Sequence, residues 1–108
     1  GGAEGARLAE AVRAALGTPG LTDACRAYLE ALGPPGDPAL LAAFLDARDR
    51  DVQRVALAAL ADGVGAGRIA PGAGLRAQLR TLAEGLDDAL AEAAEAVLAA
   101  ADGPARLP

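Results

Sequence analysis

Apolar residues recur at intervals of three and four along six separate segments of the chain, and this spacing constrains the fold more than any other feature. Side chains spaced in this way share one face of an α-helix, and Gly or Pro interrupts the pattern between most segments. The apolar positions are Leu8, Ala11, Val12, Ala15 and Leu16; Ala24, Ala27, Tyr28, Ala31 and Leu32; Leu41, Phe44 and Leu45; Val52, Val55, Ala56, Ala59 and Leu60; Leu75, Leu79, Leu82, Ala83 and Leu86; and Leu90, Ala93, Ala94, Val97 and Leu98. Aromatic residues make up 2% of the chain, which disfavours strands. We therefore predict an all-α fold of six short helices.

Capping residues indicate where four of these helices begin. A side-chain oxygen before a helix accepts a hydrogen bond from its first turn, and carboxylates there also match the positive end of the helix dipole. The candidates, in chain order, are Thr22 or Asp23, Asp37 followed by Pro38, Asp49 with Asp51, and Asp87 with Asp88.

A Gly-rich connector separates the fourth helix from the fifth. Residues 63–74 contain five Gly and one Pro, and we expect Asp62 and Gly63 to end the fourth helix because such a composition opposes helix formation. Val64 and Ile69 are expected to attach the connector to the core.

Internal repetition groups the six helices into three antiparallel pairs. A shift of 38 positions places the apolar residues of the fourth helix on those of the sixth, and those of the third on the fifth. The second helix matches the fourth at a shift of 28. We therefore expect one domain over residues 1–108, with units at about 6–33, 37–62 and 72–101. Because Met is absent and the chain starts with two Gly residues, we expect it to be a fragment of a longer protein.

Residues 41–60 resemble a HEAT repeat. They combine an apolar first helix, an Asp-containing turn and a second helix of the Val-Arg-x-Ala-Ala type that recurs in the family, here residues 52–56. Gln53 replaces the usual Arg, and Ala91 occupies that position in the third unit. The resemblance implies a short α-solenoid over about residues 6–101, in which stacked helix pairs share one continuous core. The alternative fold is a compact helical bundle.

The resemblance also implies a binding surface on the second helix of each pair. Its expected partner-binding residues are Arg26, Leu29, Gln53, Arg54, Leu57, Glu92 and Glu95. Leu29 and Leu57 have two alternative roles, since they either form an exposed apolar anchor for a partner helix or peptide or pack between repeats. In the first case Arg26 and Arg54 would pair with acidic groups of the partner.

The sequence offers no recognisable set of catalytic residues. It contains neither Ser nor His, which often serve as nucleophile and as base near neutral pH, and Cys25 is expected to be a small buried side chain. The Gly-rich stretch lacks the Lys of a phosphate-binding loop, and the Asp residues between 46 and 51 suit helix caps better than Ca²⁺ ligands. We predict no enzymatic activity, no cofactor and no metal. A minor alternative is a lyase similar to the HEAT-like lyases that act on bilin chromophores.

Charge narrows the classes of partner. The net charge is −5 and the sequence pI is about 4.5, which disfavours nucleic acids and anionic membranes. No apolar run is long enough to span a bilayer, and a lone Cys suits the cytoplasm. All ten basic residues are Arg, as expected of a GC-rich bacterial genome. We therefore expect a cytoplasmic scaffold or adaptor that binds a protein, with self-association, by stacking on further repeats or a second copy, as the alternative.

Overall fold

Six α-helices make up most of the chain, as the apolar spacing predicts. The computed structural model describes residues 2–103, and within them all regular structure is helical. The helices are α1 (Gly2–Ala15), α2 (Leu21–Leu32), α3 (Pro38–Leu45), α4 (Arg50–Gly65), α5 (Ala73–Ala83) and α6 (Asp88–Asp102). The all-α class is thereby confirmed. Among these helices, none has both the length and the apolar character that a bilayer crossing requires.

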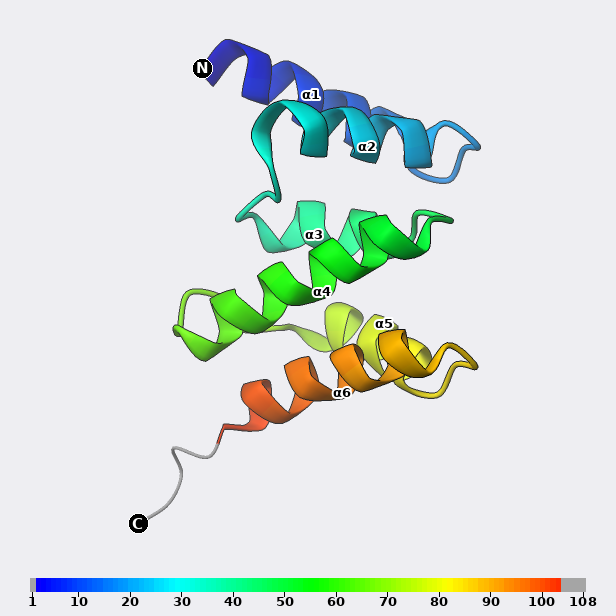
Figure 1. Cartoon of the computed structure of the whole chain (residues 1–108). Coiled ribbons are helices and arrows are strands. Elements are labelled where there is room, and N and C mark those ends of the chain that lie inside the picture. The colour runs from blue at the N-terminus through cyan, green and yellow to red at the C-terminus, as the bar shows by residue number, and fades with distance from the viewer. Residues whose placement is uncertain (1, 104–108) are drawn as a thin grey trace.

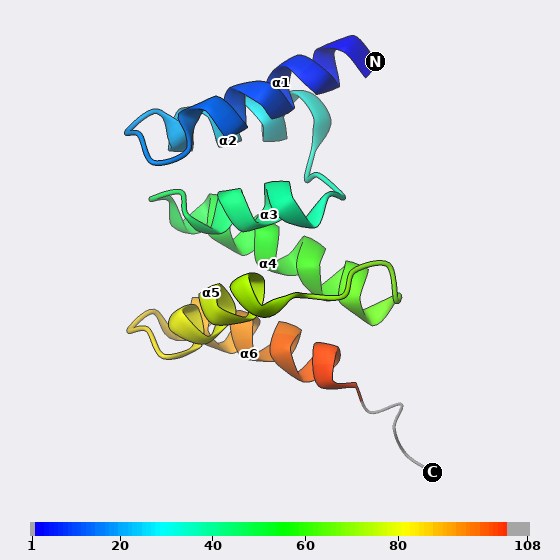
Figure 2. The same ribbon diagram turned by 180° about the vertical axis from the view of Figure 1, so that it is seen from behind.

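The helices form three hairpins arranged in two layers. α1 packs on α2, α3 on α4 and α5 on α6. Between hairpins, α3 contacts α1 and α5, whereas α4 contacts α2 and α6. We call α1, α3 and α5 the odd layer and α2, α4 and α6 the even layer; Figure 1 shows the even layer in front and Figure 2 the odd layer. The smallest dimension of the molecule is 21 Å, which matches two helix thicknesses.

One continuous core runs through the three hairpins. Its largest fully buried side chains come from all six helices: Val12, Cys25, Leu41, Phe44, Leu57, Leu60, Leu79 and Val97. The rings of Tyr28 and Phe44 meet edge to face at 5.8 Å between centroids, which joins the first hairpin to the second. Ala56 and Ala94 are completely buried, so α4 and α6 approach each other on small side chains.

Three of the predicted Asp caps are confirmed, but the predicted cap of α2 is wrong. Asp37, Asp49 and Asp87 accept hydrogen bonds from first-turn backbone N–H groups at 3.0–3.2 Å. α2 instead begins after Gly20, without a side-chain cap, so Thr22 and Asp23 both lie within its first turn. The Thr22 hydroxyl faces the next hairpin and accepts a hydrogen bond from the backbone N–H of Arg48 at 3.1 Å.

The end of α4 also differs from the prediction, because the helix continues to Gly65. Gly63 is helical and buried. A Cβ atom there would lie 2.4 Å from Cδ1 of Ile69, so the missing side chain makes room for Ile69 against the helix. The Gly63 carbonyl accepts hydrogen bonds from the N–H groups of Arg68 and Ile69. The connector is thus shorter than residues 63–74, although Val64 and Ile69 are buried as expected.

Candidate functional site

A hollow lies between α2 and α4, on the even layer where the sequence places the binding surface. Its volume is about 190 Å³. Leu29, Val52 and Val55 supply its apolar part, and the polar side chains around them are Arg26, Glu30, Asp49 and Asp51. Leu29 and Val55 are half-buried, so both can still contact a ligand.

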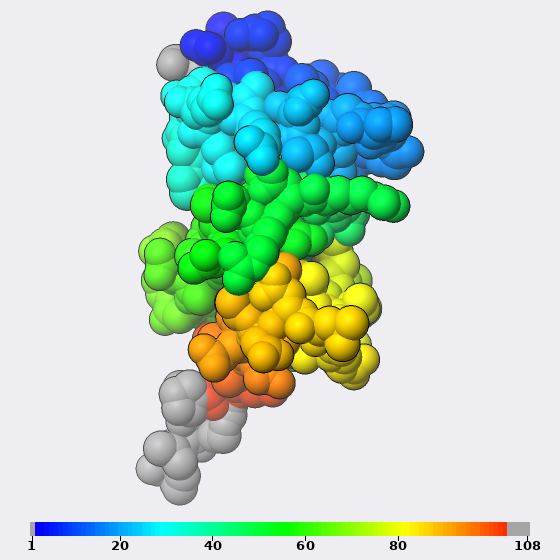
Figure 3. Space-filling model, turned by 45° about the vertical axis from the view of Figure 1, so that its right-hand side comes forward, coloured from blue at the N-terminus to red at the C-terminus, as the bar shows by residue number. Residues whose placement is uncertain are grey.

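A second hollow of about 390 Å³ adjoins the first along α4. Val55 lines both hollows. The second hollow continues over Ala58, Ala59 and Asp62 and is also lined by residues 34–36, Gly63, Arg68 and Ile69. We call the two hollows together the α4 trough. Its apolar floor runs along the middle helix of the even layer, which Figure 3 shows in green between α2 and α6.

The predicted partner-binding residues differ in whether they line the trough. Arg26, Arg54, Glu92 and Glu95 are exposed, but only Arg26 lines the trough. Leu29 is partly buried against the core and also lines the trough. The two Glu residues lie on α6, beyond the edge of the trough.

Leu57 and Gln53 serve the fold rather than a binding surface. Leu57 is 1% exposed, so the alternative in which it packs between repeats is correct and its role as an exposed anchor is excluded. The reason is that α4 contacts α2, α3 and α6, which leaves little of its circumference free. Gln53 is half-buried, and its Nε2 donates a hydrogen bond to the Leu45 carbonyl at 3.0 Å, joining α4 to α3.

Two of the Arg side chains in the even layer are held by helix caps. Arg26 of α2 forms an ion pair with Asp49, the cap of α4, and Arg50 of α4 forms one with Asp87, the cap of α6. The pKa of Asp49 is lowered, first by the hydrogen bond from the Val52 N–H and then by Arg26. The pKa of Asp87 is lowered mainly by Arg50. These guanidinium groups are therefore neutralised within the protein.

The even layer is consequently acidic. With its caps it carries three Arg residues, at positions 26, 50 and 54, and ten acidic residues, at positions 23, 30, 49, 51, 62, 87, 88, 92, 95 and 102. The remainder of residues 2–103 carries five acidic and six basic residues. Arg54 joins none of the ion pairs formed within residues 2–103. The earlier expectation that Arg26 and Arg54 receive acidic groups of a partner therefore fits this face poorly.

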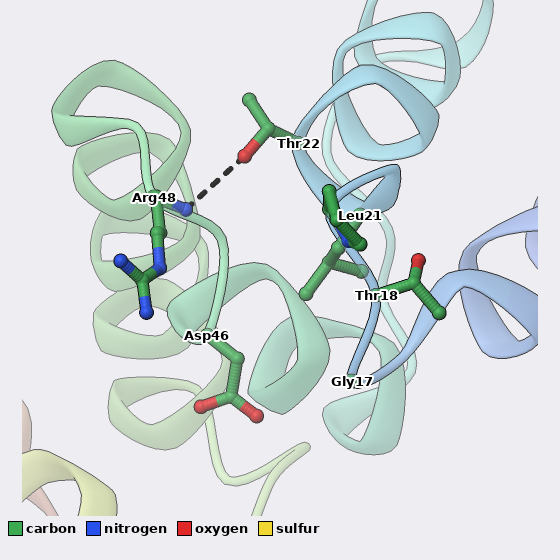
Figure 4. A pocket seen from close by; sticks show the side chains of 7 residues that line it. Gly17, Thr18, Leu21, Thr22, Asp46 and Arg48 are labelled. Atoms are coloured by element: carbon green, nitrogen blue, oxygen red, sulfur yellow. Dashed lines mark hydrogen bonds between the residues drawn. The ribbon is translucent and has the colours of Figure 1, made fainter.

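A further hollow, of about 700 Å³, lies where the turn between α1 and α2 meets the turn between α3 and α4. Figure 4 shows Thr18, Leu21 and Thr22 of the first hairpin facing Asp46 and Arg48 of the second across it. Thr18 and Thr22 already make hydrogen bonds, Thr18 within its own turn and Thr22 with the Arg48 N–H. Within residues 2–103 no three His, Cys, Asp or Glu residues are grouped so that they could hold a metal ion. The two hydroxyl groups of this hollow therefore already have partners within the protein, and we do not assign a reaction to it.

The sequence analysis missed Val55, Glu30, Asp51 and Asp62 as surface residues of the trough. Val55 belongs to the apolar stripe of α4, and this stripe is wider than the part of the helix that is fully buried. The width of the stripe was the one feature of the sequence that could have indicated an accessible apolar residue. The acidic residues gave no signal because their position depends on how α2 and the 34–36 turn pack beside α4.

Comparisons with protein-family models, with curated proteins and with solved structures find no match to this chain. The likeness to HEAT repeats therefore rests on the pattern of residues 41–60 alone and stays a prediction.

Proposed function

We propose that the chain is a non-catalytic protein-interaction module that binds a helix or peptide of a partner protein in the α4 trough. The observation that carries the proposal is that two adjoining hollows share Val55 and give α4 an accessible apolar floor. Peptide-binding surfaces commonly combine such a floor with a polar rim. The rim here consists of charged side chains from α2, α4 and the connector.

The surroundings of α4 support a preformed surface. α4 is the central helix of the even layer and is held from three sides by α2, α3 and α6. Its first turn is fixed by the Asp49 cap and by the ion pair of Asp49 with Arg26. A surface that is ordered before binding loses less conformational entropy when a ligand docks.

The test is selection of random peptides, displayed on phage, against the immobilised chain, followed by affinity measurements on purified variants. Val55→Gln places a polar amide on the trough floor, and Gln is compatible with the helix at this position because it has a good helix propensity. Leu16→Gln is the matched control, because Leu16 is 46% exposed and lies outside the trough. We expect selected peptides to bind Val55→Gln about tenfold more weakly than the native chain, and Leu16→Gln equally well. Equal affinity for all three proteins would rule out the trough as the binding site.

A specific observation favours self-association as a second candidate function. Leu86, between α5 and α6, is 101% exposed, and Leu75, Leu82 and Leu98 of the same hairpin are half-buried. Apolar side chains at the end of a helical stack can pack on a further unit or a second copy. Light scattering over a range of concentrations tests this candidate. A mass that rises with concentration in the native chain, but not in Leu86→Gln, would support it, and a constant monomer mass would exclude it.

A further inference from the structure

The charges at the two ends of the α4 trough carry information about its ligand. Glu30 and Asp51 lie at the end near α2, and Asp62 lies at the end near the connector. All three are exposed, and none takes part in an ion pair within residues 2–103. Arg26 and Arg68 are the Arg residues that line the trough. Arg26 is bound to Asp49, whereas Arg68 joins no ion pair within residues 2–103. Negative charge therefore dominates the end near α2, whereas the charges of Asp62 and Arg68 balance each other at the connector end.

The floor between these ends is apolar over a defined length. Asp51 and Asp62 are eleven residues apart in the same helix, which corresponds to about 16 Å along its axis. Val52, Val55, Ala58 and Ala59 line the trough between them. A ligand that matches this surface carries an apolar segment of similar length with a positive group at the end that meets Glu30 and Asp51.

We propose that the occupant of the trough is a peptide segment of a partner protein in which Lys or Arg residues adjoin one end of a short apolar stretch. This inference rests on the proposed function and specifies its ligand. The apolar side chains of the segment cover Val55 and its neighbours and exclude water from them. The basic residues meet Glu30 and Asp51 at the end near α2, which fixes the direction of the segment in the trough and disfavours acidic competitors.

The phage-selected pool tests the inference directly. We expect the enriched sequences to contain Lys or Arg on one side of two or more Leu, Ile, Val or Met residues. An acidic pool, or one with no basic enrichment over the unselected library, would overturn the inference. If binding of that pool is still weakened by Val55→Gln, the proposed function stands and only the assignment of charge is wrong. If no sequence is enriched at all, both are overturned.

A pair of charge-neutralising variants tests the acidic end of the trough near α2. Glu30→Gln with Asp51→Asn removes both unpaired carboxylates of that end, and Glu10→Gln with Glu84→Gln makes the same change in net charge on the odd layer. We expect an enriched basic peptide to bind the first variant about fivefold more weakly than the native chain, with less than a twofold change for the second. Its affinity should also fall as NaCl is raised. If the peptide bound both variants equally weakly, the effect would come from net charge alone and the inference would be contradicted. An affinity that does not change with salt would also contradict it.

Discussion

The Nε of Arg50, the first residue of α4, lies 2.5 Å from Oδ2 of Asp87, the residue that caps α6. Asp87 thus performs two tasks, because its other oxygen accepts the backbone N–H groups of Ala89 and Leu90. Asp49 does the same at the start of α4, where it accepts the Val52 N–H and pairs with Arg26 of α2. At both boundaries in the even layer, one carboxylate therefore caps its own helix and binds the preceding hairpin.

Removal of this dual contact should destabilise the fold. Asp87→Ala loses both the cap and the partner of Arg50, whereas Asp88→Ala removes a neighbouring exposed carboxylate that does not cap the helix. We expect a clearly lower midpoint of thermal unfolding, followed by circular dichroism, for Asp87→Ala. Equal midpoints for the two variants would show that the cap contacts contribute no net stability.

Acid should weaken the fold through the same carboxylates. The pKa values of Asp49 and Asp87 lie below their ordinary value of 3.8 in the folded protein, so the folded state favours their charged forms. The resulting stability is fully present above pH values near 3.8 and is lost as the pH falls through the lowered folded-state pKa. We expect urea denaturation to show this acid-side loss in the native chain and a smaller loss in the variant Asp49→Asn with Asp87→Asn. An identical pH dependence would contradict this assignment.

Cys25 should be unreactive until the protein unfolds. Its side chain is completely buried, and burial raises the pKa of the thiol to about 11, so the nucleophilic thiolate is scarce at neutral pH. We expect a thiol reagent such as dithionitrobenzoate to react slowly at pH 8 with the folded chain and rapidly in guanidinium chloride. Rapid reaction without denaturant would mean that the core around Cys25 opens readily.

Truncation of Leu57 should be far more damaging than truncation of an exposed Leu. Leu57→Ala leaves a cavity in the centre of the even layer, and we expect a loss of about 3 kcal/mol in the free energy of unfolding. Leu86→Ala, at the fully exposed position, should change it by less than about 0.5 kcal/mol. Denaturant titrations measure both values, and a small effect at Leu57 would contradict its place in the core.

The end of α4 offers a comparison between two glycines. A Cβ atom at Gly63 would collide with Ile69, whereas a Cβ atom at Gly65 has no atom within 4 Å outside its own helical turn. Gly65→Ala should therefore raise the unfolding midpoint, because Ala favours the helix, and Gly63→Ala should lower it unless Ile69 can move aside. An increase at both positions would show that the contact between Gly63 and Ile69 is loose.

Local signals in the sequence were sufficient to predict the six helices and three of their caps. The periodicity of Leu, Val and Ala predicts each helix from residues of that helix alone, and each Asp cap contacts the first turn of its own helix. The structure confirms the six helices and the caps Asp37, Asp49 and Asp87. Long-range contacts explain the errors. Gly63 remains helical because Ile69 packs against it, and the Thr22 hydroxyl is engaged by a residue 26 positions away.

The candidate site was predicted at the level of its helices but not of its residues. The sequence placed it on the second helix of each pair, and Arg26 and Leu29 do line the trough. It could not distinguish Leu57 from Val55, because both lie on apolar parts of α4 and only the packing of α2, α3 and α6 decides which one is buried. The acidic character of the even layer became visible only after the Arg partners of Asp49 and Asp87 were known.

The most direct test of a binding site in the α4 trough is an NMR titration of the ¹⁵N-labelled chain with an enriched peptide. If the trough is the site, the largest changes in amide chemical shift fall on α2 around Leu29 and Glu30 and on α4 from Asp51 to Asp62, with little change in α1 and α5. Changes concentrated in α5 and the end of α6, with α4 unaffected, would contradict the central claim and place binding at the last hairpin.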